Sequence, residues 1–140
     1  MPVPLPPEFA AYSTDGHIQL SSGLYVPSLT NTTNVSSSSI PYDGNFQWIK
    51  VGSVVTVSGI LNVTPTTSGL NTQLDIDLPV GTSIAAYGEE GRLAGLGVML
   101  LTLTSLAVKI YGVSNKARLE FLASDTSAND VAVSFTYRVV

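Results

Sequence analysis

The sequence predicts an all-β fold: a single antiparallel β-sandwich of about eight strands, a jelly roll or a similar arrangement of two packed sheets. Apolar and polar residues alternate along many short segments, and no segment has a helical period. Turn signals, such as the Tyr-Asp-Gly-Asn stretch at residues 42–45, separate these segments. Thr, Ser, Val and Gly are abundant, and this composition favours strands and turns.

Length and composition narrow the class of protein further. The chain has 140 residues, which fits one domain with a real hydrophobic core. It has no cysteine, which excludes disulfides and thiolate metal sites. Only 11% of the residues are charged, against about a quarter in ordinary soluble domains. The simplest explanation for so few charged residues is that oligomerisation buries part of the surface. An exterior rich in Ser, Thr and Asn would also account for the low charge.

The charge pattern argues against nucleic acid and membrane partners. The net charge is −4, and the six basic residues are scattered along the chain. We therefore expect no nucleic-acid binding. The most apolar stretch, residues 93–108, is shorter than the about 20 residues of a spanning helix and contains two glycines, so we expect no membrane insertion.

Residues 1–22 are predicted to form an extended N-terminal arm, separate from a β-sandwich domain at residues 23–140. Four prolines within the first seven residues favour an extended backbone, and the start lacks the basic residues of a signal peptide. Aromatic residues are uncommon in solvated linkers, so we expect an arm that docks on a neighbouring protein, with a disordered tail as the alternative. The expected anchoring residues are Pro4, Pro6, Phe9, Tyr12 and Ile18.

The first half of the domain contains clear strand patterns. Residues 23–35 are expected to form a strand at a sheet edge, because Pro27 removes a backbone donor. Residues 45–51 and 53–63 form the next two strands, joined by a tight turn at Gly52. Further strands are expected at residues 70–78, 106–113, 117–123 and 131–139.

Residues 92–103 are apolar on both faces of the predicted strand. Leu93, Met99, Leu101 and Leu103 share one face, and Leu96, Val98 and Leu100 share the other. A strand of this kind is expected to be buried on both sides. An antiparallel domain of this size rarely buries both faces of a strand within one subunit. We therefore predict that Leu96, Val98 and Leu100 lie in a subunit interface.

The sequence offers no catalytic or metal-binding constellation. The single histidine, His17, lies in the arm before the fold begins, so a Ser-His-Asp site is not expected. Asp75 and Asp77 share one face of a strand, but no loop motif for calcium surrounds them, and they are expected to be solvated. No phosphate-binding loop or nucleophile elbow is present. We expect neither an enzyme nor a cofactor.

Three aromatic residues are candidates for contact with a glycan. Trp48 is the only tryptophan, and an exposed Trp48 would offer a stacking platform for a sugar, with Tyr42 or Tyr87 nearby. A buried Trp48 would instead be part of the core.

An ordered series of short segments resembles a known module. Residues 24–31 read LYVPSLTN, similar to the "TYTPTLTN" opening of a C-terminal module of phage tail and head fibre proteins. Residues 46–59 end in VVTVSG, which is similar to the module's next strand. Residues 63–69, 72–80 and 133–140 resemble its "DPTT-G" loop, its "TQL-I-LPV" segment and its closing "FTYRI" strand.

The resemblance covers residues 24–140 and implies a β-sandwich that forms a homotrimer in a virion. It therefore implies a bacteriophage structural protein: a short head or tail fibre, or a capsid decoration protein. The arm at residues 1–22 would bind another virion protein, and the trimer would attach to a host or surface. Residues 114–118 depart from the module's usual turn. A carbohydrate-binding adhesion module, with a cell-surface glycan as partner, is the alternative function.

Overall fold

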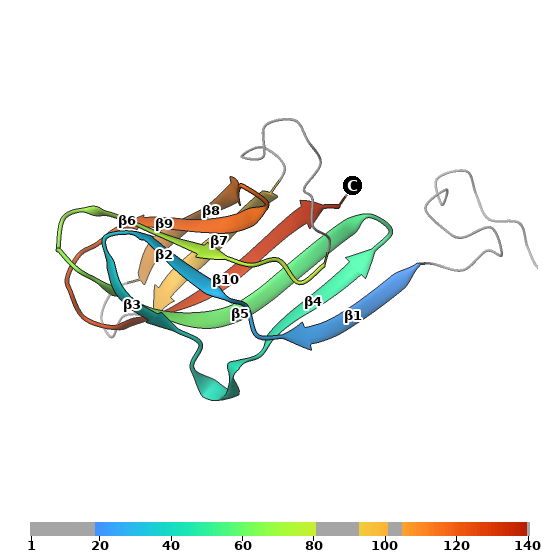
Figure 1. The fold of residues 1–140 in the computed structure, drawn as a ribbon, viewed down its shortest axis with the longest axis horizontal. Helices are drawn as coiled ribbons and strands as arrows, with labels where there is room; N and C mark the ends of the chain where they lie inside the picture. Colours follow the sequence, from blue (N-terminus) through green and yellow to red (C-terminus); the bar gives the residue numbers. More distant parts are fainter. Residues whose placement is uncertain (1–18, 81–92, 101–104, 140) are drawn as a thin grey trace, which may run out of the picture.

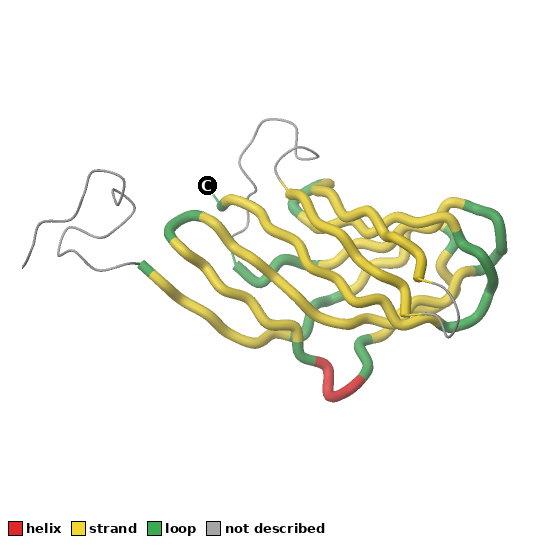
Figure 2. The backbone as a smooth tube through the Cα atoms, turned by 180° about the vertical axis from the view of Figure 1, so that it is seen from behind, coloured by secondary structure: helices red, strands yellow, loops and turns green. Residues whose placement is uncertain are grey.

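The computed structural model describes residues 19–80, 93–100 and 105–139. Nearly all of this part is strand, and the one helical element in it is a short 3-10 turn, η2, at Tyr42–Gly44 (Figure 2). The strands are β1 (Leu20–Tyr25), β2 (Leu29–Thr33), β3 (Val35–Ser39), β4 (Phe46–Val51), β5 (Val54–Pro65), β6 (Asn71–Ile76), β7 (Leu93–Leu100), β8 (Ser105–Val113), β9 (Lys116–Leu122) and β10 (Asn129–Arg138). The all-β prediction is confirmed.

The strands form one antiparallel sheet that curls on itself. The order along the sheet is β1-β4-β5-β10-β7-β8-β9-β6-β2, and β3 pairs with β5. The C-terminal strand β10 lies between β5 and β7 near the middle of this path (Figure 1). β10 pairs with β5 over its whole length, from Asn129 opposite Val63 to Arg138 opposite Val54. The last strand therefore belongs to the centre of the sheet.

A kink at Asn34 lets the sheet curl back on itself. Asn34 has a left-handed backbone, with φ of 56°, a conformation that Asn adopts more readily than most residues. Its side-chain amide donates to the Thr67 carbonyl and to Thr72 Oγ1, both at 2.8 Å, and its Oδ1 accepts from the Thr67 backbone N–H. On either side of the kink, β2 pairs with β6 and β3 pairs with β5. Consecutive strands thus join two distant parts of the sheet.

Along each central strand, alternate side chains point into a single core. The fully buried large side chains include Phe46, Val55, Val57, Leu61, Leu74, Ile76, Leu93, Met99, Leu119, Phe135 and Tyr137. The Phe46 ring lies directly over Gly59, where a Cβ atom would come within 2.2 Å of it. The Tyr25 ring meets the Phe46 ring edge-on, with 6.0 Å between the ring centres. The period-2 patterns of the sequence therefore correspond to one inward and one outward face.

Several expected strands have the predicted faces, and others differ. β5 buries Val55, Val57, Leu61 and Val63, as the alternation predicts. Residues 23–35, expected to be one strand, instead contribute to β1, β2 and β3, because Pro27 and Asn34 interrupt the pairing. β1 begins at Leu20, within the residues expected to form the arm. The predicted turn between β4 and β5 is confirmed at Gly52, whose φ is 59°.

Candidate functional site

The most prominent surface feature is an apolar outer face of the curled sheet. The outward side chains of β1, β4, β5, β10 and β7 form it, and we call it the apolar face. Its large exposed members are Leu20, Leu24, Ile49, Val51, Val54, Ile60, Leu96, Val98 and Leu100. Leu96 is 72% exposed, which is unusual for a leucine in the interior of a sheet. Monomeric soluble proteins rarely expose so many large apolar side chains on one surface.

The strand register brings the β5 and β7 members of this face together. Ile60 of β5 lies opposite Ala132 of β10, which lies opposite Val98 of β7. One row further along, Ser134 of β10 lies opposite Leu96. The apolar residues of β7 and β5 are therefore joined across β10 by small side chains that do not project far from the sheet.

Charge is nearly absent from the apolar face. In the described part of the chain, its only charged side chains are Asp130 and Arg138, near opposite ends of β10. The polar positions between them are mostly hydroxyl and amide groups, such as the Thr56 and Thr136 hydroxyls, which lie 3.2 Å apart across β5 and β10. No unpaired charge would thus have to be desolvated if the middle of this face were covered.

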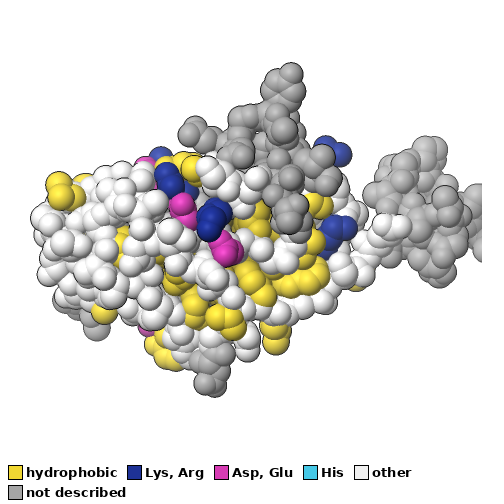
Figure 3. Space-filling model, in the orientation of Figure 1, with side chains coloured by type: hydrophobic (Ala, Val, Ile, Leu, Met, Phe, Trp, Pro, Cys, Tyr) yellow, Lys and Arg dark blue, Asp and Glu magenta, His cyan; other side chains and the backbone are white. Residues whose placement is uncertain are grey.

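Beyond β7 the row that contains Leu96 becomes charged. Lys109 of β8 follows Leu96 in the cross-strand register and pairs with Glu120 of β9 at 2.8 Å. Glu120 also accepts hydrogen bonds from the Tyr111 hydroxyl and the Gln73 amide. In Figure 3, basic and acidic side chains lie side by side on the face in view. The ion pairs and the apolar face therefore occupy different parts of the sheet.

The expectation that Asp75 and Asp77 form a solvated pair was wrong for Asp75. Asp75 is only 7% exposed, and its carboxylate makes two hydrogen bonds to the guanidinium of Arg118, at 2.7 and 2.9 Å. Arg118 lies directly opposite it on β9. Asp77 pairs with Lys116 at 2.7 Å. Both carboxylates have a basic partner from β9. The alternation of residues along one strand does not reveal such partners on a neighbouring strand.

We predict that Glu120 makes the stability of the protein depend on pH in the acidic range. Hydrogen bonds from Lys109, Tyr111 and Gln73 lower the pKa of Glu120 to about 2 from the ordinary 4.5. Its contribution is therefore fully present above pH 4.5 and is lost as the pH falls towards 2. The substitution Glu120→Gln should lower the free energy of unfolding by about 1–2 kcal/mol at pH 7. Urea titrations at several pH values measure this difference.

The difference between the wild type and Glu120→Gln should shrink as the pH falls from about 5 to 2, because protonation removes the same charge from the wild type. A difference that stays constant over this range would contradict the assignment.

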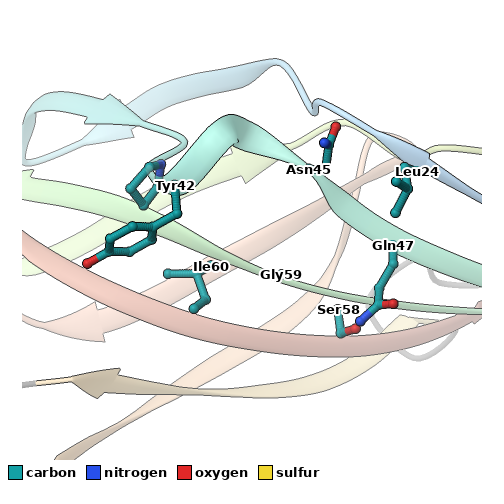
Figure 4. A pocket seen from close by; sticks show the side chains of 8 residues that line it. Leu24, Tyr42, Asn45, Gln47, Ser58, Gly59 and Ile60 are labelled. Carbon is teal, nitrogen blue, oxygen red and sulfur yellow. The ribbon is translucent and has the colours of Figure 1, made fainter.

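A shallow groove lies at the β4–β5 end of the apolar face, beside the 3-10 turn. Its volume is about 190 Å³, and we call it the Tyr42 groove. The lining residues are Leu24, Pro41, Tyr42, Asn45, Gln47, Ser58, Gly59 and Ile60. In Figure 4, Ser58, Gly59 and Ile60 of β5 form the floor, the Tyr42 ring lies above Ile60, and the Gln47 side chain points towards Ser58.

Tyr42 is held in a defined position although its side chain is exposed. Its residue exposure is 75% and its φ is 55°, a backbone conformation that is uncommon for an aromatic residue. Its hydroxyl donates to Asp130 Oδ2 at 2.8 Å, and the Asn62 amide donates to Asp130 Oδ1 at 2.9 Å. The hydrogen bonds from Asn62 and Tyr42 lower the pKa of Asp130, so this carboxylate is ionised at neutral pH.

The structure separates the aromatic residues that the sequence suggested as glycan contacts. Tyr42 lines the groove on the outer side. Trp48 points the other way: it is partly buried, packs against the core and lies against Gly23. Tyr87 lies outside the described residues, as do Pro4, Pro6, Phe9, Tyr12 and Ile18 of the predicted arm.

Leu96, Val98 and Leu100 all point outward from β7, whereas Leu93 and Met99 are buried in the core. Sequence reasoning missed Ile60 and Ile49 as members of the same surface. Their alternation is visible in the sequence, but the register that joins them to β7 through β10 is not. It also missed Asn62 and Asp130, which hold Tyr42 from strands distant in the sequence.

Within the described residues, no three His, Asp or Glu side chains gather in a way that could hold a metal ion. No helix in residues 19–80, 93–100 and 105–139 has the length and apolar character of a membrane span.

Comparison with known proteins does not assign the chain to a family: no protein-family model matches it, and no curated protein or solved structure is significantly similar to it.

Proposed function

We propose that this chain is a structural protein of a virion, a short head or tail fibre or a capsid decoration protein of a bacteriophage. In this proposal the β-domain is a trimeric β-sandwich displayed for attachment to a host or surface. The N-terminal arm, residues 1–22, anchors it to another virion protein. It is not an enzyme.

The apolar face is the observation that carries this proposal. Its exposed leucine, isoleucine and valine side chains are of the kind that an oligomer interface buries, at about 25 cal/mol per Å² of apolar surface. A second copy of the chain is the favoured occupant of the part around Leu96, Val98 and Leu100, because this part has almost no charge to desolvate and borders the Lys109–Glu120 pair, which stays hydrated at the rim. The order of segments shared with phage fibre modules supports a trimer.

The arrangement of the strands also supports a structural role. The apolar face lies on the outside of a sheet that encloses its own hydrophobic core within one chain. In the described part, no buried polar side-chain atom is left without a hydrogen bond. Association would therefore join finished domains and would not be needed to complete a core. Domains that associate in this way suit a displayed virion component.

The test is the solution mass of the full chain by light scattering down to low micromolar concentration. We expect a mass of three chains for the wild type. The double substitution Leu96→Lys and Val98→Lys should dissociate it to a single chain, because two lysines would have to be desolvated in the interface. A wild type that is monomeric throughout would refute the proposed trimer.

Leu70→Lys is the matched control. Leu70 is exposed just before β6 and outside the apolar face, so a lysine there should leave the number of associated chains unchanged. Removal of residues 1–18 should leave the number of associated chains unchanged, because β1 begins at Leu20. Dissociation by Leu70→Lys would mean that the association does not depend on the apolar face.

A further inference from the structure

We infer that the Tyr42 groove binds one neutral sugar residue at the end of a glycan. The groove combines an exposed aromatic ring, the apolar side chains of Leu24 and Ile60, and several polar side chains within a small volume. This combination suits a sugar, which has C–H groups on the faces of its ring and hydroxyls around its edge. All the lining residues belong to one chain, and β10 separates the β5 floor of the groove from the proposed contact at Leu96, Val98 and Leu100 on β7.

The Tyr42 ring supplies the platform. A sugar packs its C–H groups on an aromatic face, which carries a partial negative charge. Such stacking is effective only when the ring is already in place, since ordering a mobile side chain costs free energy. The bond from the Tyr42 hydroxyl to Asp130 fixes the outer end of the ring, which lies beside Ile60 (Figure 4), and the Tyr42 backbone is left-handed. Backbone conformations of this kind concentrate at ligand sites.

The polar side chains of the groove are available for a ligand. Asn45, Gln47 and Ser58 make no side-chain hydrogen bond within the described part of the chain, although each can both donate and accept. Gln47 and Ser58 are cross-strand neighbours, and Figure 4 shows the Gln47 amide next to the Ser58 hydroxyl. An amide beside a hydroxyl can bond to two adjacent sugar hydroxyls, because each of these also donates and accepts.

The charges around the groove select for a neutral sugar. Among the described residues no lysine or arginine lines it, so none of them would neutralise a carboxylate, sulfate or phosphate on the ligand. Asp130 is ionised and lies at the Tyr42 end, where it would repel an acidic sugar. Both of its oxygens already accept bonds from Tyr42 and Asn62, so its role is to position the ring.

The size of the groove limits the ligand to one sugar ring. Its volume of about 190 Å³ lies below the about 300–1,000 Å³ of typical small-molecule pockets. Few contacts of this kind give weak binding, and we expect dissociation constants in the millimolar range for one site. A trimer would present three such grooves, and avidity would strengthen attachment to a surface that displays many glycans.

The experiment is a titration of the ¹⁵N-labelled full chain with the methyl glycosides of glucose, galactose, mannose and N-acetylglucosamine. We expect at least one glycoside to shift the amide signals of Gln47 and Ser58 in a saturable way, up to ~50 mM. The substitution Tyr42→Asn removes the ring, and asparagine tolerates the left-handed backbone, so the turn should persist. This variant should bind about tenfold more weakly or not at all.

Tyr42→Phe is the matched variant, because it keeps the ring and removes only the bond to Asp130. It should bind more weakly than the wild type but more tightly than Tyr42→Asn, since the ring remains for stacking but its outer end is no longer fixed by Asp130. Light scattering of each variant at the same concentration separates an effect on the groove from an effect on association. No shift of Gln47 and Ser58 with any of the four glycosides would overturn the inference, as would unchanged binding in Tyr42→Asn.

Discussion

Replacement of Gly95 by alanine is expected to destabilise the fold by about 3 kcal/mol or more, a large part of the stability of a small domain. A Cβ atom at Gly95 would lie 2.4 Å from the Ser134 carbonyl oxygen, 2.4 Å from Phe135 Cβ and 2.7 Å from Phe135 Cα. Two of these atoms belong to the backbone of β10, so a side-chain rotation cannot relieve the clash. β7 would have to move away from β10 at the centre of the sheet.

Gly97→Ala is the matched control, two residues further along the same strand. Its Cβ atom would meet the Ala132 carbonyl oxygen at 3.1 Å and the side chains of Val108 and Val131 at 3.2 and 3.3 Å. Shifts of a few tenths of an ångström would accommodate it, and alanine also loses less conformational entropy on folding than glycine. We expect a change within about 1 kcal/mol. Urea unfolding measures both variants, and equal losses would contradict the close approach of β7 to Phe135.

The second large effect is expected for Asp75→Ala, which should cost about 2–3 kcal/mol at pH 7. The substitution leaves the guanidinium of Arg118 without the carboxylate that accepts two of its hydrogen bonds in a site largely shielded from water. An uncompensated charge of this kind costs more than the net contribution of the pair itself. Thermal and urea unfolding of the variant and the wild type, with association monitored by light scattering, measure this loss.

Two further variants show whether the loss comes from a buried charge. Asp77→Ala breaks the Lys116 pair, whose side chains are 37% and 41% exposed, and should cost less than about 1 kcal/mol. The double substitution Asp75→Leu and Arg118→Leu should recover most of the stability lost in Asp75→Ala, because no charge remains to be desolvated. If the double variant is less stable than Asp75→Ala, the explanation through an unpaired Arg118 is wrong.

Much of the fold follows from local patterns in the sequence. Residues 53–63 alternate apolar and polar side chains, and β5 buries its Val55, Val57, Leu61 and Val63 as this pattern requires. Gly52 marks a turn because few residues other than glycine adopt its positive φ without cost. The two faces of β7 could also be assigned, since successive side chains on a strand point to opposite sides.

The candidate sites depend on contacts between residues that are far apart in the sequence. Ile60, Ala132 and Val98 form one row only because β10 lies between β5 and β7. The position of the Tyr42 ring depends on Asp130, 88 residues away along the chain. Trp48 was a candidate for stacking, but the parity of β4 directs it towards the core, against Gly23.

The sequence by itself determined that the chain is all-β, which side chains alternate on each strand, and that Leu96, Val98 and Leu100 share a face opposite Leu93 and Met99. These properties depend on neighbours along the chain and on the pleat of a strand. Only the tertiary structure decided that the sheet curls back through Asn34, that Asp75 is paired with Arg118, and that Ile60 of β5 and Val98 of β7 lie in one row across β10. The physical reason is that the cross-strand register and the order of strands are set by packing between distant segments, and local alternation contains no information about either.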